Sequence, residues 1–179
     1  MSKKFPQRKS LRLKGYDYTQ SGAYFVTICT HRRYLWFGDV VDAAMVYTDV
    51  GEMAIERWLA LPEHYSYVEL DMYVVMPNHM HGIILINKSS AENDIATSVT
   101  ISTHKKGLQA GSLGVIIGTY KASVKRTLRR QQSHMDDTLW QTGFHEHIIR
   151  DEAGLNRLRR YILINPKKCE EDKFYRETK

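Results

Sequence analysis

The chain has 179 residues, of which 42% are hydrophobic and 26% charged, with a formal net charge of +6 and a pI near 9.3. This composition excludes a disordered or fibrous protein, and the length suffices for one domain with a buried core. Two cysteines exclude a disulfide framework, and no apolar run is long enough to cross a membrane, so we expect a cytoplasmic protein.

Positive charge is concentrated in two segments without acidic residues, residues 1–15 and 112–132. Such segments favour a polyanionic partner, and we expect nucleic acid. We interpret residues 1–15 as a basic arm and residues 16–179 as a single domain. The candidate phosphate-binding residues are Lys3, Lys4, Arg8, Lys9, Arg12, Lys14, Lys121, Lys125 and Arg129. The last three step by four and therefore form one ridge of a helix.

Runs of aromatic and β-branched side chains predict the strands. Two of them are joined by the short connection Pro77-Asn78. The expected strands are residues 23–30, residues 35–41 (a short strand or hairpin), and residues 67–76, 79–86 and 143–150.

Three segments with apolar residues at helical spacing predict helices. Thr48 and Asp151 are candidate N-caps, and Pro62 and Pro166 are expected to end the helices that follow these caps. The expected helices are residues 48–61, 112–130 and 151–164.

Residues 87–111 are rich in small and polar side chains and predict a long flexible loop. The order of the elements is strand, helix, two strands, helix, strand and helix. This order predicts an α+β fold with an antiparallel sheet.

His79 and His81 lie two positions apart on an expected strand. Side chains at this spacing point to the same face, about 7 Å apart at the backbone, and can bind one divalent cation. His145 and His147 have the same spacing. Spacing alone does not choose between the two pairs, or between a metal site and histidines with a structural role.

Tyr161 lies beside the apolar stripe of the last expected helix, and Asn165 follows on the same helix face. The amide oxygen of Asn165 is a candidate third metal ligand beside His79 and His81. A tyrosine aligned with a metal-bound phosphodiester can attack phosphorus and form a phosphotyrosine. Two alternatives are a nuclease that uses water and a tyrosine that serves only as core.

Four parts of the chain resemble the HUH-type single-tyrosine transposases, in particular the REP-associated tyrosine transposases and their insertion-sequence relatives. The resemblance implies a ferredoxin-like, RRM-like antiparallel sheet with helices packed on one face and a C-terminal helix that carries the nucleophilic tyrosine. The matching segments are residues 24–30 (YFVTICT), 76–82 (MPNHMHG), 112–124, and the C-terminal block at 140–150 and 161–166.

The resemblance also implies the roles of the site residues. It makes Tyr161 the nucleophile, His79 and His81 ligands of Mg²⁺ or Mn²⁺, and His147 a candidate neighbour of the active site. It implies cleavage and rejoining of single-stranded DNA near hairpins, through a 5′-phosphotyrosine, by a nucleoid-associated monomer or homodimer. The alternative is a catalytically inactive DNA-binding protein on the same fold.

Removal of residues 1–15 is expected to weaken binding to a DNA hairpin and to flatten its salt dependence. The reason is that fewer lysine and arginine side chains would then displace counterions from phosphates. A salt titration of hairpin affinity checks this expectation. An unchanged affinity across the titration would contradict it.

Overall fold

Four antiparallel strands form the central sheet of the structure. The computed structural model describes residues 16–88, 109–131, 138–171 and 174. The strands of the sheet are β1 (Gly22–Cys29), β4 (Val68–Met76), β5 (His79–Ile86) and β6 (His145–Ile149). The α-helices are α1 (Asp49–Leu59), α2 (Leu61–His64), α4 (Leu113–Gln131) and α5 (Glu152–Ile164).

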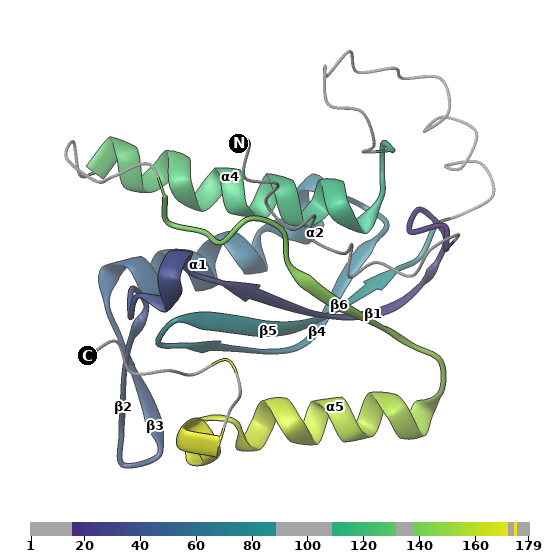
Figure 1. Ribbon diagram of the computed structural model, residues 1–179. Helices are drawn as coiled ribbons and strands as arrows, with labels where there is room; N and C mark the ends of the chain where they lie inside the picture. The colour runs from purple at the N-terminus through teal and green to yellow at the C-terminus, as the bar shows by residue number, and fades with distance from the viewer. Residues whose placement is uncertain (1–15, 89–108, 132–137, 172–173, 175–179) are drawn as a thin grey trace, which may run out of the picture.

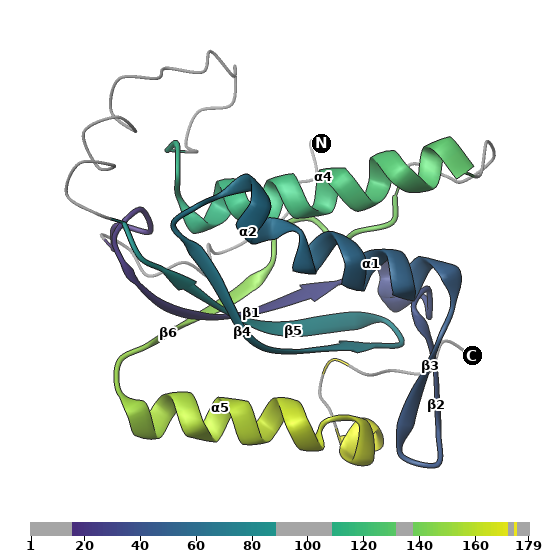
Figure 2. The same cartoon turned by 180° about the vertical axis from the view of Figure 1, so that it is seen from behind.

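The strand order in the sheet is β4-β5-β1-β6, so β1 and β5 occupy the centre. Along the chain the elements of this unit follow as β1, α1, β4, β5, α4 and β6. This is the ferredoxin-like arrangement, and the predicted α+β fold with an antiparallel sheet is confirmed. Figures 1 and 2 place α1, α2 and α4 on one side of the sheet and α5 on the other.

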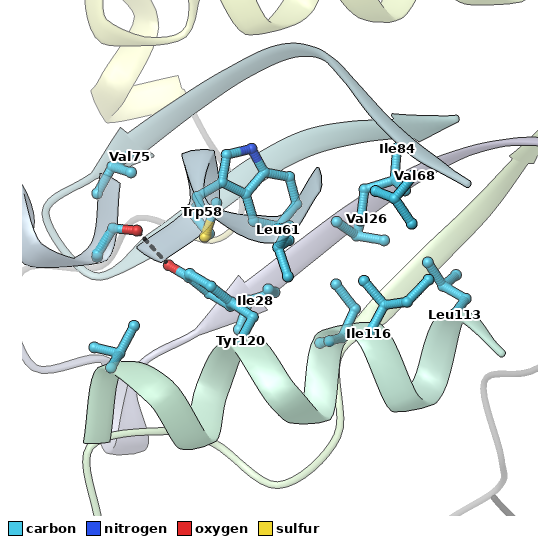
Figure 3. Close-up of a cluster of buried hydrophobic side chains, with 14 of the residues drawn as sticks. Val26, Ile28, Trp58, Leu61, Val68, Val75, Ile84, Leu113, Ile116 and Tyr120 are labelled. Atoms are coloured by element: carbon cyan, nitrogen blue, oxygen red, sulfur yellow. Dashed lines mark hydrogen bonds between the residues drawn. The ribbon is translucent and has the colours of Figure 1, made fainter. Parts of the chain in front are cut away.

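The larger core lies between the sheet and the helices α1 and α4. Trp58 and Tyr120 meet there edge to face, and the Tyr120 hydroxyl donates to the carbonyl oxygen of Ala54 at 3.2 Å (Figure 3). A Cβ at Gly82 would lie 2.3 Å from the Trp58 ring, so β5 needs glycine at this point. The apolar face predicted for α4 is buried in this core at Leu113, Ile116, Ile117, Tyr120, Val124 and Leu128.

The helix α5 covers the opposite face of the sheet. Its predicted N-cap is confirmed, because the Oδ1 atom of Asp151 accepts from the Gly154 N–H at 2.6 Å. The predicted apolar stripe at Leu155, Leu158 and Ile162 packs into a second, smaller cluster with residues of β4 and β5. The sheet therefore has two covered faces, and α5, the C-terminal segment that follows it, and the side chains of Val40 and Met45 pack on the second.

An ion pair joins α5 to the edge strand β4. Arg159 donates to Asp71 through Nη2 at 2.5 Å and through Nε at 3.0 Å. Asp71 lies where the pairing of β4 with β5 shifts register, between Leu70 and Tyr73. The hydrogen bonds from Arg159 hold the pKa of the Asp71 carboxyl below its usual value.

Two local expectations need correction. The expected strand at 35–41 is one half of a hairpin, β2 (Gly38–Val41) and β3 (Ala44–Tyr47). The second half was not predicted. Asp42 and Ala43 form its two-residue turn with φ values of 50° and 61°, which few non-glycine residues adopt. Pro62 does not end α1; it lies in the first turn of α2, where its missing N–H costs no hydrogen bond.

The predicted basic arm at 1–15 and most of the predicted loop at 87–111 lie outside the described residues. The described loop ends are tied to the fold, since the N–H of Lys88 donates to the Ser21 hydroxyl at 3.0 Å. Among the helices that the structure describes, none combines the length and apolar character needed to cross a bilayer.

We expect Asp71→Asn to lower the urea midpoint of unfolding at neutral pH. Because the folded-state pKa of Asp71 is lowered, its contribution is present above the pKa of an unfolded carboxyl, about 4, and is lost as pH falls through the folded value. The difference in urea midpoint between wild type and variant should therefore disappear at acidic pH. Urea titrations at neutral and acidic pH measure it. Glu152→Gln is the control, because Glu152 is exposed and its carboxylate lies as far as 3.9 Å from Arg159. An equal loss of stability in both variants would contradict a specific role for the Asp71–Arg159 ion pair.

Candidate active site

The histidines of β5 point away from the larger core. Met80 packs into that core, so the alternation of the strand turns His79 and His81 to the face covered by α5. Both side chains are completely buried. Their Nε2 atoms lie 3.1 Å apart. The spacing in the sequence therefore predicted correctly that the two imidazoles converge.

The second ring nitrogen of each histidine has its own partner. Nδ1 of His79 lies 2.8 Å from Oδ1 of Asn78, whose Nδ2 donates to the carbonyl oxygen of Arg33 at 3.3 Å. An amide oxygen only accepts, so Nδ1 of His79 carries the proton and Nε2 keeps its lone pair. Nδ1 of His81 lies 2.8 Å from the Thr27 hydroxyl.

Tyr161 reaches this pair from α5. Its hydroxyl lies 3.2 Å from Nε2 of His81, across 80 positions of sequence. The ring of Phe25 stacks on His81 with centroids 5.2 Å apart and meets Tyr161 edge to face at 6.0 Å. Helix α5 and the aromatic contact from β1 thus place the phenol beside the histidines, as the sequence predicted.

Asn165 is the C-cap of α5 and is 2% exposed, so it is buried at the end of the helix that carries Tyr161. It remains the predicted third ligand. No group of three or more His, Cys, Asp or Glu side chains suited to a metal occurs in the described residues. A cation here would therefore rest on His79, His81 and an amide oxygen.

The two imidazoles fit such a cation. Neighbouring ligands of an octahedral ion with bonds of about 2.1 Å lie about 3 Å apart. The separation of 3.1 Å between the two Nε2 atoms matches this value. Because the contact with Asn78 places the proton of His79 on Nδ1, its Nε2 keeps a lone pair. A neutral imidazole with a free lone pair is the form that binds metals.

The second histidine pair lies on the same face of the sheet. His145 is level with Thr27 and therefore in the same row as His81, while His147 is level with Phe25. His145 packs on the ring of Phe174, with centroids 5.1 Å apart. His145 is thus the member of the pair that shares a partner with the site.

Phe174 covers the histidine pair of β5, His79 and His81. Its ring centroid lies 5.7 Å from the rings of both His79 and His81. Arg33 donates to its carbonyl oxygen at 3.0 Å and places its guanidinium over the ring. Sequence reasoning missed Phe174, as it missed Thr27 and Asn78; only the adjacency of Asn78 to the histidine motif was a visible signal.

The predicted ridge on α4 lies on the opposite side of the sheet from Tyr161 (Figure 1). Lys121 donates to the carbonyl oxygens of Gln141 at 2.6 Å and Gly143 at 2.9 Å. Burial lowers the pKa of Lys121 to about 8. Its ammonium group holds the segment before β6 onto α4. Lys125 is half-buried and Arg129 exposed, while the other six predicted basic residues lie outside the described residues.

No protein-family model matches the chain. An uncharacterized protein of Haemophilus influenzae is 32% identical over 169 residues, which cover 94% of this chain and 93% of that protein. A second protein of the same organism, named "Putative REP-associated tyrosine transposase", is 24% identical over 152 residues, which cover 85% of this chain and 74% of that protein. The solved structure of a REP-associated tyrosine transposase bound to a REP hairpin aligns with a TM-score of 0.54 and 19% identity, over 90% of this chain and 76% of that one.

The chain therefore has the fold of a REP-associated tyrosine transposase and is similar in sequence to a protein of that name. The resemblance seen in the sequence segments is thereby confirmed, and so is the fold that it implied. The site on the α5 face is the part of this fold where two histidines and a tyrosine meet.

We expect Lys121→Met to lower the free energy of unfolding by about 1–3 kcal/mol, because two carbonyl oxygens lose a charged donor. Urea titration measures this loss. Lys125→Met, one helical turn along α4, is the matched control and should cost less. If Lys121→Met instead kept full stability and weakened DNA binding, the lysine would act as a phosphate contact rather than as an internal tie.

Proposed function

We propose that this protein is a transposase, a metal-dependent enzyme that cleaves and rejoins single-stranded DNA near hairpins through a 5′-phosphotyrosine on Tyr161. The observation that carries this proposal is the 3.2 Å contact between the Tyr161 hydroxyl and Nε2 of the buried His81. This contact places the phenol on one of two converging imidazoles, which is the arrangement that a nucleophile beside a metal ion needs.

His79 and His81 would hold Mg²⁺ or Mn²⁺, with Asn165 as the candidate third ligand. When bound, such an ion polarises a phosphate oxygen and orients the leaving group. The Nε2 atom of His81 has one lone pair when its Nδ1 is protonated, so it cannot bind a metal and accept the Tyr161 proton at once. His81 would therefore act either as a metal ligand or as the acceptor of the hydrogen bond from the phenol.

In the cleavage step the oxygen of Tyr161 forms a bond to phosphorus, and the bond from phosphorus to the 3′ oxygen breaks. The phenol loses its proton, and the departing 3′ oxygen gains one, so the products are a 5′-phosphotyrosine and a free 3′-hydroxyl. The energy of the phosphodiester is retained in the protein linkage, and attack by a 3′-hydroxyl reverses the step. Rejoining therefore needs no nucleotide cofactor.

The proposed partner is a single-stranded DNA hairpin. Three observations support it: the net charge of +6, the similarity in sequence to a protein named as a REP-associated tyrosine transposase, and a related fold solved with a REP hairpin. The basic residues predicted on α4 lie across the sheet from Tyr161, so DNA that reached both would pass around an edge of the sheet.

The test is a denaturing gel with labelled single-stranded hairpins drawn from repeats near the gene, with Mn²⁺ or with EDTA. We expect a denaturant-resistant shifted band for the wild type with Mn²⁺, and none for Tyr161→Phe or with EDTA. Tyr34→Phe is the matched control, because Tyr34 is an exposed tyrosine outside the site, and it should behave as the wild type.

Two outcomes would overturn the proposal. Cleavage by Tyr161→Phe without a covalent band would identify a nuclease that uses water. Hairpin binding without either cleavage or a band, for several repeats and both metals, would identify a DNA-binding protein without catalysis.

A further inference from the structure

A cavity of about 380 Å³ opens where β6 meets α5. Its walls come from both faces of β6, with Ile148 and Tyr18 on one side and His147 on the other. β6 pairs only with β1 in the described sheet, so the cavity lies along the free edge of the sheet. Its volume is in the range of small-ligand sites, roughly 300–1,000 Å³.

The cavity has a cationic side. Arg150, directly after β6, and Arg157, in the second turn of α5, both line it and are exposed to solvent. Two carboxylates also line the cavity: Asp151, the N-cap of α5, accepts from the Gly154 N–H, and Glu146 lies on β6. Arginine presents a planar fork of donors that matches phosphate oxygens, so this side suits a phosphate group.

The opposite side combines two apolar residues with the carboxylate of Glu146. Ile148 is half-buried and packs against the larger core, and Tyr18 is 9% exposed within an aromatic cluster with Tyr16 and Tyr24. A ligand that combines a phosphate with a flat ring whose edge carries N–H donors fits these two sides, because the carboxylate of Glu146 accepts hydrogen bonds. A single nucleotide has this composition.

The cavity lies next to the candidate active site. His147 is level with Phe25, whose ring contacts both His81 and Tyr161. Arg157 precedes Tyr161 by four residues on α5, so the two side chains share one helix face, one turn of about 5.4 Å apart. A phosphate on Arg157 would therefore neighbour the phosphate that Tyr161 attacks.

The geometry points to a nucleotide subsite in this cavity: one unpaired nucleotide beside the cleaved phosphate, its own phosphate on Arg150 and Arg157 and its base against Ile148 and Tyr18. This inference rests on the proposed function, because it takes the DNA strand from the reaction at Tyr161. It adds a site that reads the single strand next to the cut, separate from any contact with the hairpin stem.

The test compares two labelled DNA probes, a short oligothymidylate and a blunt-ended hairpin, by fluorescence anisotropy in the Tyr161→Phe background, where no cleavage intervenes. We expect the double substitution Arg150→Gln and Arg157→Gln to weaken oligothymidylate binding on the order of tenfold. The salt slope for this probe should fall by roughly 0.7 for each phosphate that the two arginines no longer neutralise. Hairpin binding should stay as it was.

Arg160→Gln is the matched control, since Arg160 is exposed on the same helix outside the cavity, and it should change neither probe. Arg150→Lys with Arg157→Lys should restore part of the oligothymidylate affinity, because the charge returns without the planar fork. Thermal unfolding should be the same in all variants, which separates weaker phosphate binding from a disturbed fold.

Equal weakening of both probes, or of neither, would overturn the subsite while the covalent reaction of Tyr161 still stood. If neither probe bound any form of the protein, the proposed DNA function would fail, and the subsite with it.

Discussion

The antiparallel pairing of β1 with β5 is the constraint on which the site depends. It sets Thr27 beside His81, so that a hydroxyl from one strand meets the ring of the other at 2.8 Å. The same register turns Met80 and Gly82 into the larger core, where Gly82 leaves room for Trp58. A slip of one residue would send both histidines into that core and leave their nitrogens without polar partners.

The larger hydrophobic core and the candidate active site lie on opposite faces of the sheet. Helices α1 and α4 bury the larger core on one face. On the other face, α5 packs through a small cluster and the ion pair between Arg159 and Asp71, and it brings Tyr161 to His81. Helix α5, which carries Tyr161, is therefore fixed to the sheet by an apolar stripe and by an ion pair to the edge strand.

Basic residues are divided between structural and surface roles. Lys121, which the sequence groups with Lys125 and Arg129, uses its ammonium group to hold the chain before β6. That tie supports the strand which carries His145 and His147 and which borders the cavity with Arg150 and Arg157. The arginines that border the cavity near Tyr161 thus lie on α5 and after β6, outside the two acid-free basic segments of the sequence.

The sequence by itself determined the four strands of the central sheet, the three long helices, the N-caps Thr48 and Asp151 of two of them, and the common direction of His79 and His81. These features depend on periodicity and capping within a few residues, and so they can be seen locally. Only the tertiary structure decided that Thr27 and Asn78 orient the imidazoles, that Phe174 covers them, and that His145 rather than His147 shares this contact. Those relations depend on strand register and on how α5 and the C-terminal segment dock, which are set by contacts between residues far apart in the chain.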